Sequence, residues 1–530
     1  MALIELSRAS DVFYSRPLFT QEANPLDLAG LYGRGVPKIL AQFLDDSAEK
    51  PGAPLVSSNE ALQGWSHSVI QQAGRLSQLE HLLELANDGV FDIGKSGSYQ
   101  YELLATREII DCEAFDLADQ HWLRDLTSEI DAPLQNQLAQ RLPMVLERMW
   151  ELVFPSRGDF IGYDTDPEID EHFDAAGIAW ARTLDGQLEL PGDESIGGHP
   201  FYAYRAAVGI MCGIALKHAS FASELALLHQ QLDYHNLMST WSKRSKWIDV
   251  FAGVLEVDDD TADHLLDALT LDREYRDAFE AVPGAPMPPF IQVGRDDLLM
   301  SLRGCLDAPF WFVLRKLQYR FRGDWDRLVN LREEQFREDL NLLFRKDSII
   351  KSPRLVRIRS AGRDITDIDA AAFEKEHGTL LLFQLKWQDP FGFSMRERRS
   401  KMKNLISVSN TWINAVEEWT QELTRQELLQ RLGMVVNPVE HPIRRIELII
   451  LVRHHARFSG SDEPSPNAAW GTWPQICRIA VEHFQGGDLL ALLADRLREE
   501  QWRTDSPRRF ETGSLQIGDV EIVVRVEPHC

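Results

Sequence analysis

The sequence predicts a two-part α/β protein, in which a large, mainly helical N-terminal domain precedes an α/β domain built on a small mixed sheet. A chain of 530 residues is too long for one ordinary core. Apolar residues recur at helical spacing through most of the first 280 residues, whereas short runs that alternate like strands begin after Lys346. The charge also divides, because residues 1–310 have 22 Lys and Arg against 50 Asp and Glu. We therefore expect one domain over residues 1–310 and a second over residues 311–530.

The N-terminal domain is expected to begin after an irregular segment. Residues 1–35 contain several prolines and glycines, which favour turns and loops. The most apolar helix expected in this domain is Phe201–Ala222, which is interrupted by Arg205 and Lys217. The eleven uncharged residues between these two charges are too few to cross a bilayer. The pattern predicts a core helix, and no membrane partner is expected.

The second domain is expected to follow a proline-rich linker. Val282–Phe290 has four prolines in nine residues and predicts the last loop before the new unit. The elements predicted after it run in the order helix, helix, three strands, helix, strand, two helices and a C-terminal hairpin extension. Their expected ranges are Pro309–Arg322, Trp325–Phe344, Leu355–Arg359, Asp367–Phe373, Thr379–Trp387, Met395–Trp419, Arg445–Val452, Trp473–Phe484, Asp488–Gln501 and Phe510–Val526.

Three polar residues on the predicted second and third strands suggest a catalytic metal site. Asp369 supplies an anionic oxygen and Gln384 a neutral carbonyl oxygen, which are ligands suited to a hard divalent cation. Lys386, two residues further along the strand, shares a face with Gln384 and carries the positive charge that a phosphoryl transition state needs. The alternative is a solvated strand end with polar residues there by chance.

The order of elements and these residues together resemble the PD-(D/E)XK, or restriction-endonuclease-like, nuclease superfamily. That core is a helix, a three-strand meander, a helix and a strand, with an Asp on the second strand and (E/Q)-x-K on the third. The resemblance covers Trp325–Val452, with Gln384 giving the Q-x-K form seen in Mrr-type enzymes. It implies a nuclease that uses Mg²⁺ or Mn²⁺, with Asp369, Gln384 and Lys386 as catalytic residues.

Glu333 is the position matched to the acidic residue that the first helix of this superfamily contributes to the metal site. Helical spacing places Glu333 on the apolar face of Trp325–Phe344, where a carboxylate needs a partner. The resemblance therefore implies that Glu333 is a catalytic residue and a metal ligand. The alternative is a buried salt bridge to Arg357 or Arg359.

A basic zone coincides with the candidate motif, although the net charge of −26 argues against a protein that simply coats a polyanion. Residues 311–410 have 21 Lys and Arg against 14 Asp and Glu. The helix Met395–Trp419 begins with basic residues expected to contact nucleic-acid phosphates, namely Arg398, Arg399, Lys401 and Lys403. Phe391 and Phe393 are expected to pack under this helix, with base stacking as the alternative. The alternative for the whole zone is a solvated, Arg-rich helix pair.

The sequence lacks the motifs that are typical of several competing functions. The sequence has no Walker loop, G-x-G-x-x-G or G-x-S-x-G, so ATPase and α/β-hydrolase functions have no support. His454-His455 lacks ligand-spaced partners and predicts a surface strand end. Five scattered cysteines without C-x-x-C favour a reducing compartment, and the N-terminus has no signal-peptide pattern, so the expected location is the cytoplasm.

The expected function is therefore hydrolysis of phosphodiester bonds in nucleic acid, with DNA expected over RNA. By fold-level analogy alone this layout resembles restriction and phage-defence effectors. The rival function is a non-catalytic scaffold that binds nucleic acid or protein through a degenerate nuclease fold. The acidic domain at 1–310 is expected to bind a protein partner or to mask the basic zone, and the sequence leaves the oligomeric state open.

Overall fold

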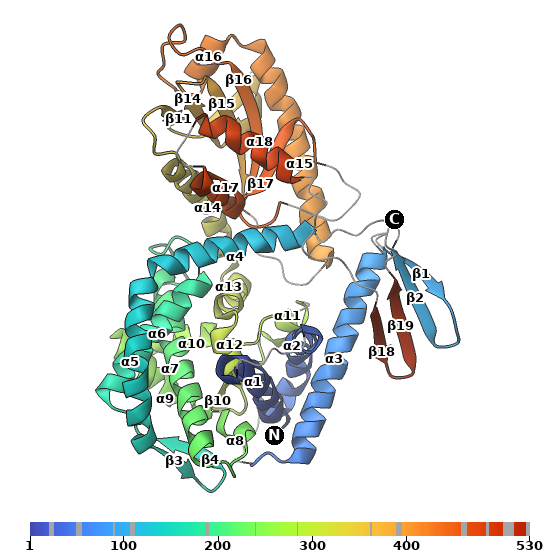
Figure 1. Cartoon of the computed structure of the whole chain (residues 1–530), viewed down its shortest axis with the longest axis vertical. Coiled ribbons are helices and arrows are strands. Elements are labelled where there is room, and N and C mark those ends of the chain that lie inside the picture. The colour runs from blue at the N-terminus through green and yellow to red at the C-terminus, as the bar shows by residue number, and fades with distance from the viewer. Residues whose placement is uncertain are drawn as a thin grey trace.

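The protein is a mixture of helices and small sheets, as the sequence predicted (Figure 1). The structure, a computed structural model of the whole chain, describes residues 1–20, 26–48, 56–87, 91–105, 112–185, 190–238, 240–282, 285–360, 363–387, 395–456, 464–483, 487–501 and 513–525.

The N-terminal half is mainly helical. Its helices are α1 (Ala2–Thr20), α2 (Leu26–Ala48), α3 (Glu60–Asn87), α4 (Cys112–Ile130), α5 (Ala132–Leu152), α6 (Pro167–Asp185), α7 (Phe201–Leu228), α8 (Tyr234–Met238), α9 (Arg244–Leu255), α10 (Asp259–Ala268), α11 (Arg276–Glu280), α12 (Leu302–Leu306) and α13 (Pro309–Arg320). Its strands are β1 (Phe91–Lys95), β2 (Gln100–Ala105), β3 (Val153–Ser156), β4 (Phe160–Tyr163), β5 (Ser195–Ile196), β6 (His199–Pro200), β7 (Thr240–Lys243), β8 (Thr270–Leu271), β9 (Phe290–Gln292) and β10 (Asp297–Met300).

Helix α7 lies at the centre of the largest apolar core. Among the described residues it is the one helix long and apolar enough to cross a membrane, yet 67% of its most apolar window is buried inside the protein. Phe201, Met211 and Phe221 are fully buried against neighbouring helices. The sequence-based prediction of a core helix is consistent with this burial.

Residues 1–35 are not irregular as expected, because most of them belong to α1 and α2. Gly35 in this region, together with Gly74 of α3, permits close packing of two helices instead of breaking them. A Cβ built on Gly35 would lie 2.1 Å from the carbonyl oxygen of Ile70, and one built on Gly74 would lie 2.2 Å from that of Leu31. Both contacts join α2 to α3, so only a residue without a side chain lets these helices approach.

The described residues of the proline-rich segment, 282 and 285–290, pack within the N-terminal half and do not form a linker between domains. Ala285, Met287 and Phe290 are buried, and Phe290 begins β9 in the sheet β7-β10-β9-β8. Helix α13 follows this sheet and packs in the core around α7 through Phe310 and Val313. The first packed unit therefore continues well past residue 310.

The second half of the chain carries a five-stranded mixed sheet. Its elements are α14 (Arg322–Leu343), β11 (Ile349–Lys351), β12 (Val356–Ser360), β13 (Arg363–Ile368), β14 (Ala370–Glu374), β15 (Thr379–Lys386), α15 (Met395–Glu422), α16 (Arg425–Arg431), β16 (Arg445–Val452), β17 (Ala468–Thr472), α17 (Trp473–Glu482), α18 (Leu489–Gln501), β18 (Gly513–Ile517) and β19 (Val520–Arg525).

The sheet has the order β11-β14-β15-β16-β17. Strands β11, β14 and β15 are antiparallel neighbours, whereas β16 and β17 continue parallel to β15. The sequence had placed Leu355–Arg359 in this sheet, but that segment forms β12 and pairs with β13 in a separate hairpin. The strand that pairs with β14 at this edge of the sheet is β11, which is shorter than β12. Its three residues give too short a pattern to be recognised in the sequence.

Helices cover both faces of the sheet. Leu380 and Leu382 of β15 pack toward α15 and α16, whereas Leu381, Phe383 and Leu385 pack toward α14, α17 and α18. This alternation is the period-two pattern of a strand buried on both faces. The central strand is therefore positioned by two separate apolar cores.

The C-terminal hairpin does not extend this second unit. Strands β18 and β19 pair with β1 and β2 in a four-stranded sheet, where β19 runs parallel to β2 (Figure 1). Ile522 is buried there beside Leu85 of α3. The end of the chain is thus part of the N-terminal half.

The close approach of α2 to α3 gives a test of the fold. Gly74→Ala should lower the free energy of unfolding by about 1–3 kcal/mol, because its Cβ would overlap backbone that cannot move alone. Urea denaturation followed by circular dichroism measures this. The matched control is Gly64→Ala in the same helix, where nothing lies within 4 Å of the new Cβ and higher helix propensity should leave stability unchanged or raised. Equal effects of the two substitutions would contradict the packing described.

Candidate functional site

The predicted residues Asp369, Gln384 and Lys386 come together where β14 begins and β15 ends. Ala370 pairs with Phe383, so Asp369, the residue before it, lies beside Gln384. Gln384 and Lys386 continue the face of β15 that carries Leu382 and faces α15. The sheet therefore assembles these three residues at one end of its two central strands.

Asp369 is held against β15 by two hydrogen bonds. Its backbone N–H donates to the carbonyl oxygen of Phe383 at 3.1 Å. Its carboxylate oxygen Oδ2 accepts the backbone N–H of Leu385 at 2.7 Å. The carboxylate thus lies against the stretch of backbone that joins Gln384 to Lys386.

The environment of Asp369 favours its neutral form. Burial raises the pKa of this carboxyl to about 7, and the nearby charges of Asp367 and Glu333 act in the same direction. The hydrogen bond from Leu385 and the charge of Lys386 oppose the shift without cancelling it. This carboxyl, only 5% exposed, is therefore only partly ionised at neutral pH, and a further positive charge beside it would favour the ionised form.

Gln384 contributes a buried oxygen without a partner. Its side chain is 3% exposed, and Oε1 has no hydrogen-bond partner among the described residues. A buried carbonyl oxygen that accepts no hydrogen bond lowers the stability of the fold, because its lost hydrogen bonds to water are not replaced. Such an oxygen beside a carboxylate has the chemistry of a ligand for a hard cation.

Lys386 is half-buried at the carboxyl end of β15. Its carbonyl oxygen accepts the backbone N–H of Arg453 at 2.9 Å, which extends the pairing with β16 beyond the two strands. Arg453 is buried behind it, bonded to Asp339 at 3.0 Å and enclosed by Phe336, Trp387 and Trp473. The side chain of Lys386 is thus the partly accessible cation of the group.

Asp367 was not chosen as a site residue from the sequence, although it lies only two residues before Asp369. It is half-buried on β13, and its carbonyl oxygen accepts the indole N–H of Trp412 on α15 at 2.5 Å. Its charge reaches Asp369 and raises the pKa of that carboxyl. The spacing Asp367-x-Asp369 was visible in the sequence, but the sequence did not show that the strand ends at Ile368 and that a new strand begins at Ala370.

Glu333 is not buried as expected. It is exposed on α14, and the buried charge of that helix is the neighbouring Arg332, whose guanidinium lies over Trp325 at 4.7 Å. The alternative of a buried salt bridge is also wrong, since Arg359 pairs with Asp364 and Glu333 forms no ion pair with any described residue. Its charge still acts on Asp369, so Glu333 stands near the candidate site on the solvent side.

The predicted phosphate-binding residues are only partly described. Arg398 and Arg399 lie in α15, but their side chains fall outside the described residues, as do Phe391 and Phe393. Lys403 is exposed on the same helix and Lys401 is half-buried. Helix α15 itself is anchored beside the site through Trp412.

The histidine pair does not form a surface strand end. His454 and His455 are buried at 4% and 8% exposure, and α4 covers them. Gln120 of α4 donates to the carbonyl oxygen of His454 at 3.0 Å, and Asp116 accepts the N–H of Ala456 at 3.0 Å. Burial and the charges of neighbouring residues hold the pKa of His454 well below its ordinary value, so the imidazole is neutral.

The donor set fits a hard divalent ion. Asp369 offers a carboxylate with one oxygen outside its hydrogen bond to Leu385, and Gln384 offers the unpartnered Oε1. Asp367 lies near enough for its charge to act on Asp369. An arrangement of carboxylate and amide oxygens suits Mg²⁺ or Mn²⁺ better than softer metals.

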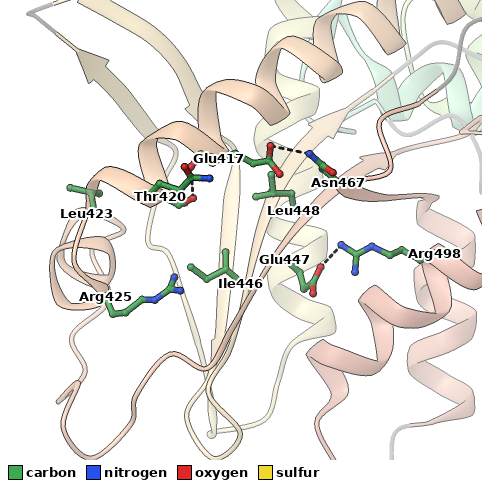
Figure 2. Close-up of a pocket in the computed structure, with 10 residues that line it drawn as sticks. Glu417, Thr420, Leu423, Arg425, Ile446, Glu447, Leu448, Asn467 and Arg498 are labelled. Carbon is green, nitrogen blue, oxygen red and sulfur yellow. Dashed lines mark hydrogen bonds and ion pairs between the residues drawn. The ribbon is translucent and has the colours of Figure 1, made fainter.

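A sizeable pocket lies at the other end of β16. Its volume is about 520 Å³, and polar and apolar residues line it, most of them from α15, β16 and α18 (Figure 2). Most of the polar side chains labelled there are already paired, as Glu417 is with Asn467 and Glu447 with Arg498. The pocket therefore lies apart from Asp369 and Lys386 and adds nothing to that site.

Comparisons of the chain with protein-family models, with curated proteins and with solved structures found no match.

The buried carboxyl of Asp369 predicts a pH-dependent stability difference. Its folded pKa is raised to about 7 from 3.8, so the unfolded chain loses this proton first and stability falls as pH rises from about 4 to 7. Asp369→Asn replaces the ionisable carboxyl by a neutral amide, so this loss of stability with rising pH does not occur in the variant. With EDTA present, the variant should be more stable than wild type by about 2–4 kcal/mol at pH 8, and the difference should vanish toward pH 4.

Urea denaturation at several pH values measures this difference. Asp347→Asn, at an exposed position, is the control and should match wild type throughout. A difference between Asp369→Asn and wild type that does not change with pH would show that the carboxyl titrates normally.

Proposed function

We propose that this protein is a metal-dependent nuclease that hydrolyses phosphodiester bonds at the junction of β14 and β15. The observation that carries the proposal is the unpartnered Oε1 of Gln384 beside the buried carboxylate of Asp369. A buried neutral oxygen and a carboxylate that favours protonation are both unfavourable for stability alone. A divalent cation held by these two side chains would compensate both.

The arrangement of the sheet supports the same function. Within the five-stranded sheet, the antiparallel strands β11, β14 and β15 follow α14, and the parallel strand β16 follows α15. The separate hairpin β12-β13 is inserted between β11 and β14, and the short helix α16 precedes β16. Apart from these insertions, the order is that expected of a restriction-endonuclease-like core, with the acidic residue immediately before the second strand of the sheet and Q-x-K at the end of the third. The support comes from the topology and the residues together, because proteins with unrelated activities can share one topology.

The chain's own residues have separate roles in the proposed reaction. Asp369 and Gln384 hold the ion, which supplies a polarised phosphoryl oxygen and an activated water when bound. Lys386 places an ammonium group next to them, where it neutralises charge that develops on the phosphate. Lys403 and its basic neighbours on α15 offer positive charge for the flanking phosphates.

The substrate class follows from this chemistry. The ligand is a nucleic acid, and DNA is proposed over RNA on the resemblance to restriction enzymes. A defence role and a cytoplasmic location belong to the same proposal. Three cysteines whose side chains the structure describes, Cys212, Cys305 and Cys477, are free and buried, which is compatible with a reducing compartment.

A scaffold without activity is the second candidate, and the burial of the site favours it. Asp369 and Gln384 are both nearly inaccessible, and one carboxylate oxygen of Asp369 is already bonded to Leu385. In that case the fold would bind nucleic acid or protein without cleaving it. Nucleic-acid binding that persists while no metal supports cleavage would favour the scaffold.

The first test is cleavage of plasmid DNA and of RNA by the full chain with Mg²⁺, Mn²⁺ or EDTA. We expect metal-dependent cleavage that Lys386→Ala reduces about 100-fold or more, because a single group that stabilises developing charge contributes roughly this much. Lys246→Ala, which removes an exposed lysine in the N-terminal half, is the matched control and should retain activity. Equal activity of Lys386→Ala and wild type would exclude Lys386 from the reaction.

The metal requirement gives a second test. A site with one buried carboxylate and a neutral amide should need roughly millimolar metal and should work better with Mn²⁺ than with Mg²⁺. Gln384→Glu adds a buried negative charge, so it should weaken the metal-free fold but lower the metal concentration needed for half-maximal cleavage. Asp369→Ala should abolish both metal dependence and cleavage. Cleavage by Asp369→Ala at the wild-type rate would place the active site elsewhere.

A further inference from the structure

The turn between β14 and β15 gathers three metal-binding side chains at the opposite end of these strands from Asp369. Glu374 is the last residue of β14, and Glu376 and His377 follow in the turn before β15 begins at Thr379. A carboxylate oxygen from each glutamate and a ring nitrogen of His377 all lie within 4.8 Å of one another. Three ligands of two chemical kinds thus converge on one point.

Glu374 is the feature that ordinary packing does not explain. Its side chain is 1% exposed, and neither carboxylate oxygen has a hydrogen-bond partner among the described residues. The Nδ1 atom of His377 is also buried without a described partner. Buried carboxylates are normally paired or bound to a metal, because an isolated buried charge is very unfavourable.

The backbone of this turn is fixed before any ligand binds. The N–H of Gly378 donates to the carbonyl oxygen of Glu374 at 2.8 Å, and the N–H of Lys375 donates to that of Ser348 at 3.0 Å. The N–H of Arg444 donates to Gly378 at 2.8 Å. Gly378 has a φ of +80°, and a Cβ there would lie 2.4 Å from the carbonyl oxygen of Pro442. A turn held on both sides keeps its ligands in position and lowers the entropy lost on binding.

We propose that Glu374, Glu376 and His377 form a binding site for a divalent transition-metal ion, with Zn²⁺ as the best match. Two carboxylates and one imidazole suit Zn²⁺, with water in the remaining position, whereas Mg²⁺ and Ca²⁺ prefer oxygen ligands throughout. Glu376 is exposed, so the ion reaches the site from solvent while Glu374 binds it from inside. The ion neutralises the buried carboxylate and stabilises the turn that aligns β14 with β15.

This site is independent of the proposed nuclease activity, since its ligands lie at the other end of the strands. Binding is therefore measured on the full chain carrying Asp369→Asn, which removes the main ligand of the first site. After EDTA treatment and its removal, titration with Zn²⁺ in competition with a chromophoric chelator should show one equivalent of bound ion.

Substitution of the ligands tests the assignment. Glu374→Gln and His377→Ala should each weaken Zn²⁺ binding at least tenfold, because even residues outside the ligand set change metal affinity roughly 10–100-fold. Glu418→Gln, at an exposed position on α15, is the control and should bind Zn²⁺ normally. Affinity unchanged in both ligand variants, or no stoichiometric Zn²⁺ binding by the parent chain, would overturn the proposal.

Thermal unfolding separates the loss of a ligand from the loss of the fold. Zn²⁺ should raise the melting temperature of the Asp369→Asn parent by about 2 °C or more and should not raise that of Glu374→Gln. Without metal, Glu374→Gln should melt at or above the temperature of the parent, because it removes a buried carboxylate that has no partner. An equal Zn²⁺-induced shift in both proteins would mean that the ion binds elsewhere.

Discussion

Helix α14 belongs to two hydrophobic cores, and the relation between the two halves of the protein depends on it. Trp325 and Leu328 near its beginning pack in the core around α7, whereas Phe336 and Leu340 near its end pack under the five-stranded sheet. A helix buried at both ends cannot rotate without exposing one of its two apolar surfaces. The halves are therefore coupled by packing, and the boundary between them lies inside a helix.

Other contacts reinforce this coupling at the end of the sheet that carries the candidate site. Helix α4 crosses there between the two halves (Figure 1), and Asp119 of α4 bonds Arg478 of α17 at 2.8 Å. The C-terminal hairpin returns to pair with β2. Each half packs against segments that belong to the other half of the chain. Variants are therefore best compared in the full chain. The acidic N-terminal half also reaches the carboxyl end of β16 directly, through the contacts of Gln120 and Asp116.

Unfavourable buried groups mark both ends of the central strands. Asp369 and Gln384 lie at one end and Glu374 at the other, each almost fully buried, and two of the three have side-chain oxygens without described partners. The surrounding sheet tolerates them because β15 is packed on both faces by apolar residues. Proteins concentrate such destabilising polar groups at functional sites, where a ligand compensates them. The same physical argument therefore supports both proposed metal sites, although their ligand chemistry differs.

The sequence by itself determined most elements of the second half and the residues at the end of β15. Strands β15 and β16 were predictable because a long apolar run leaves few alternatives, and the spacing Gln384-x-Lys386 placed two side chains on one face. Only the tertiary structure decided which strand becomes the edge of the sheet, whether Glu333 or Arg332 is buried, and that most of residues 1–35 belong to α1 and α2. The proposed site at Glu374 was equally hidden, although its three residues lie within four positions of the sequence. The physical reason is shared: burial depends on contacts with distant segments, such as α3 against α2 or Pro442 against Gly378, and local periodicity contains no information about them.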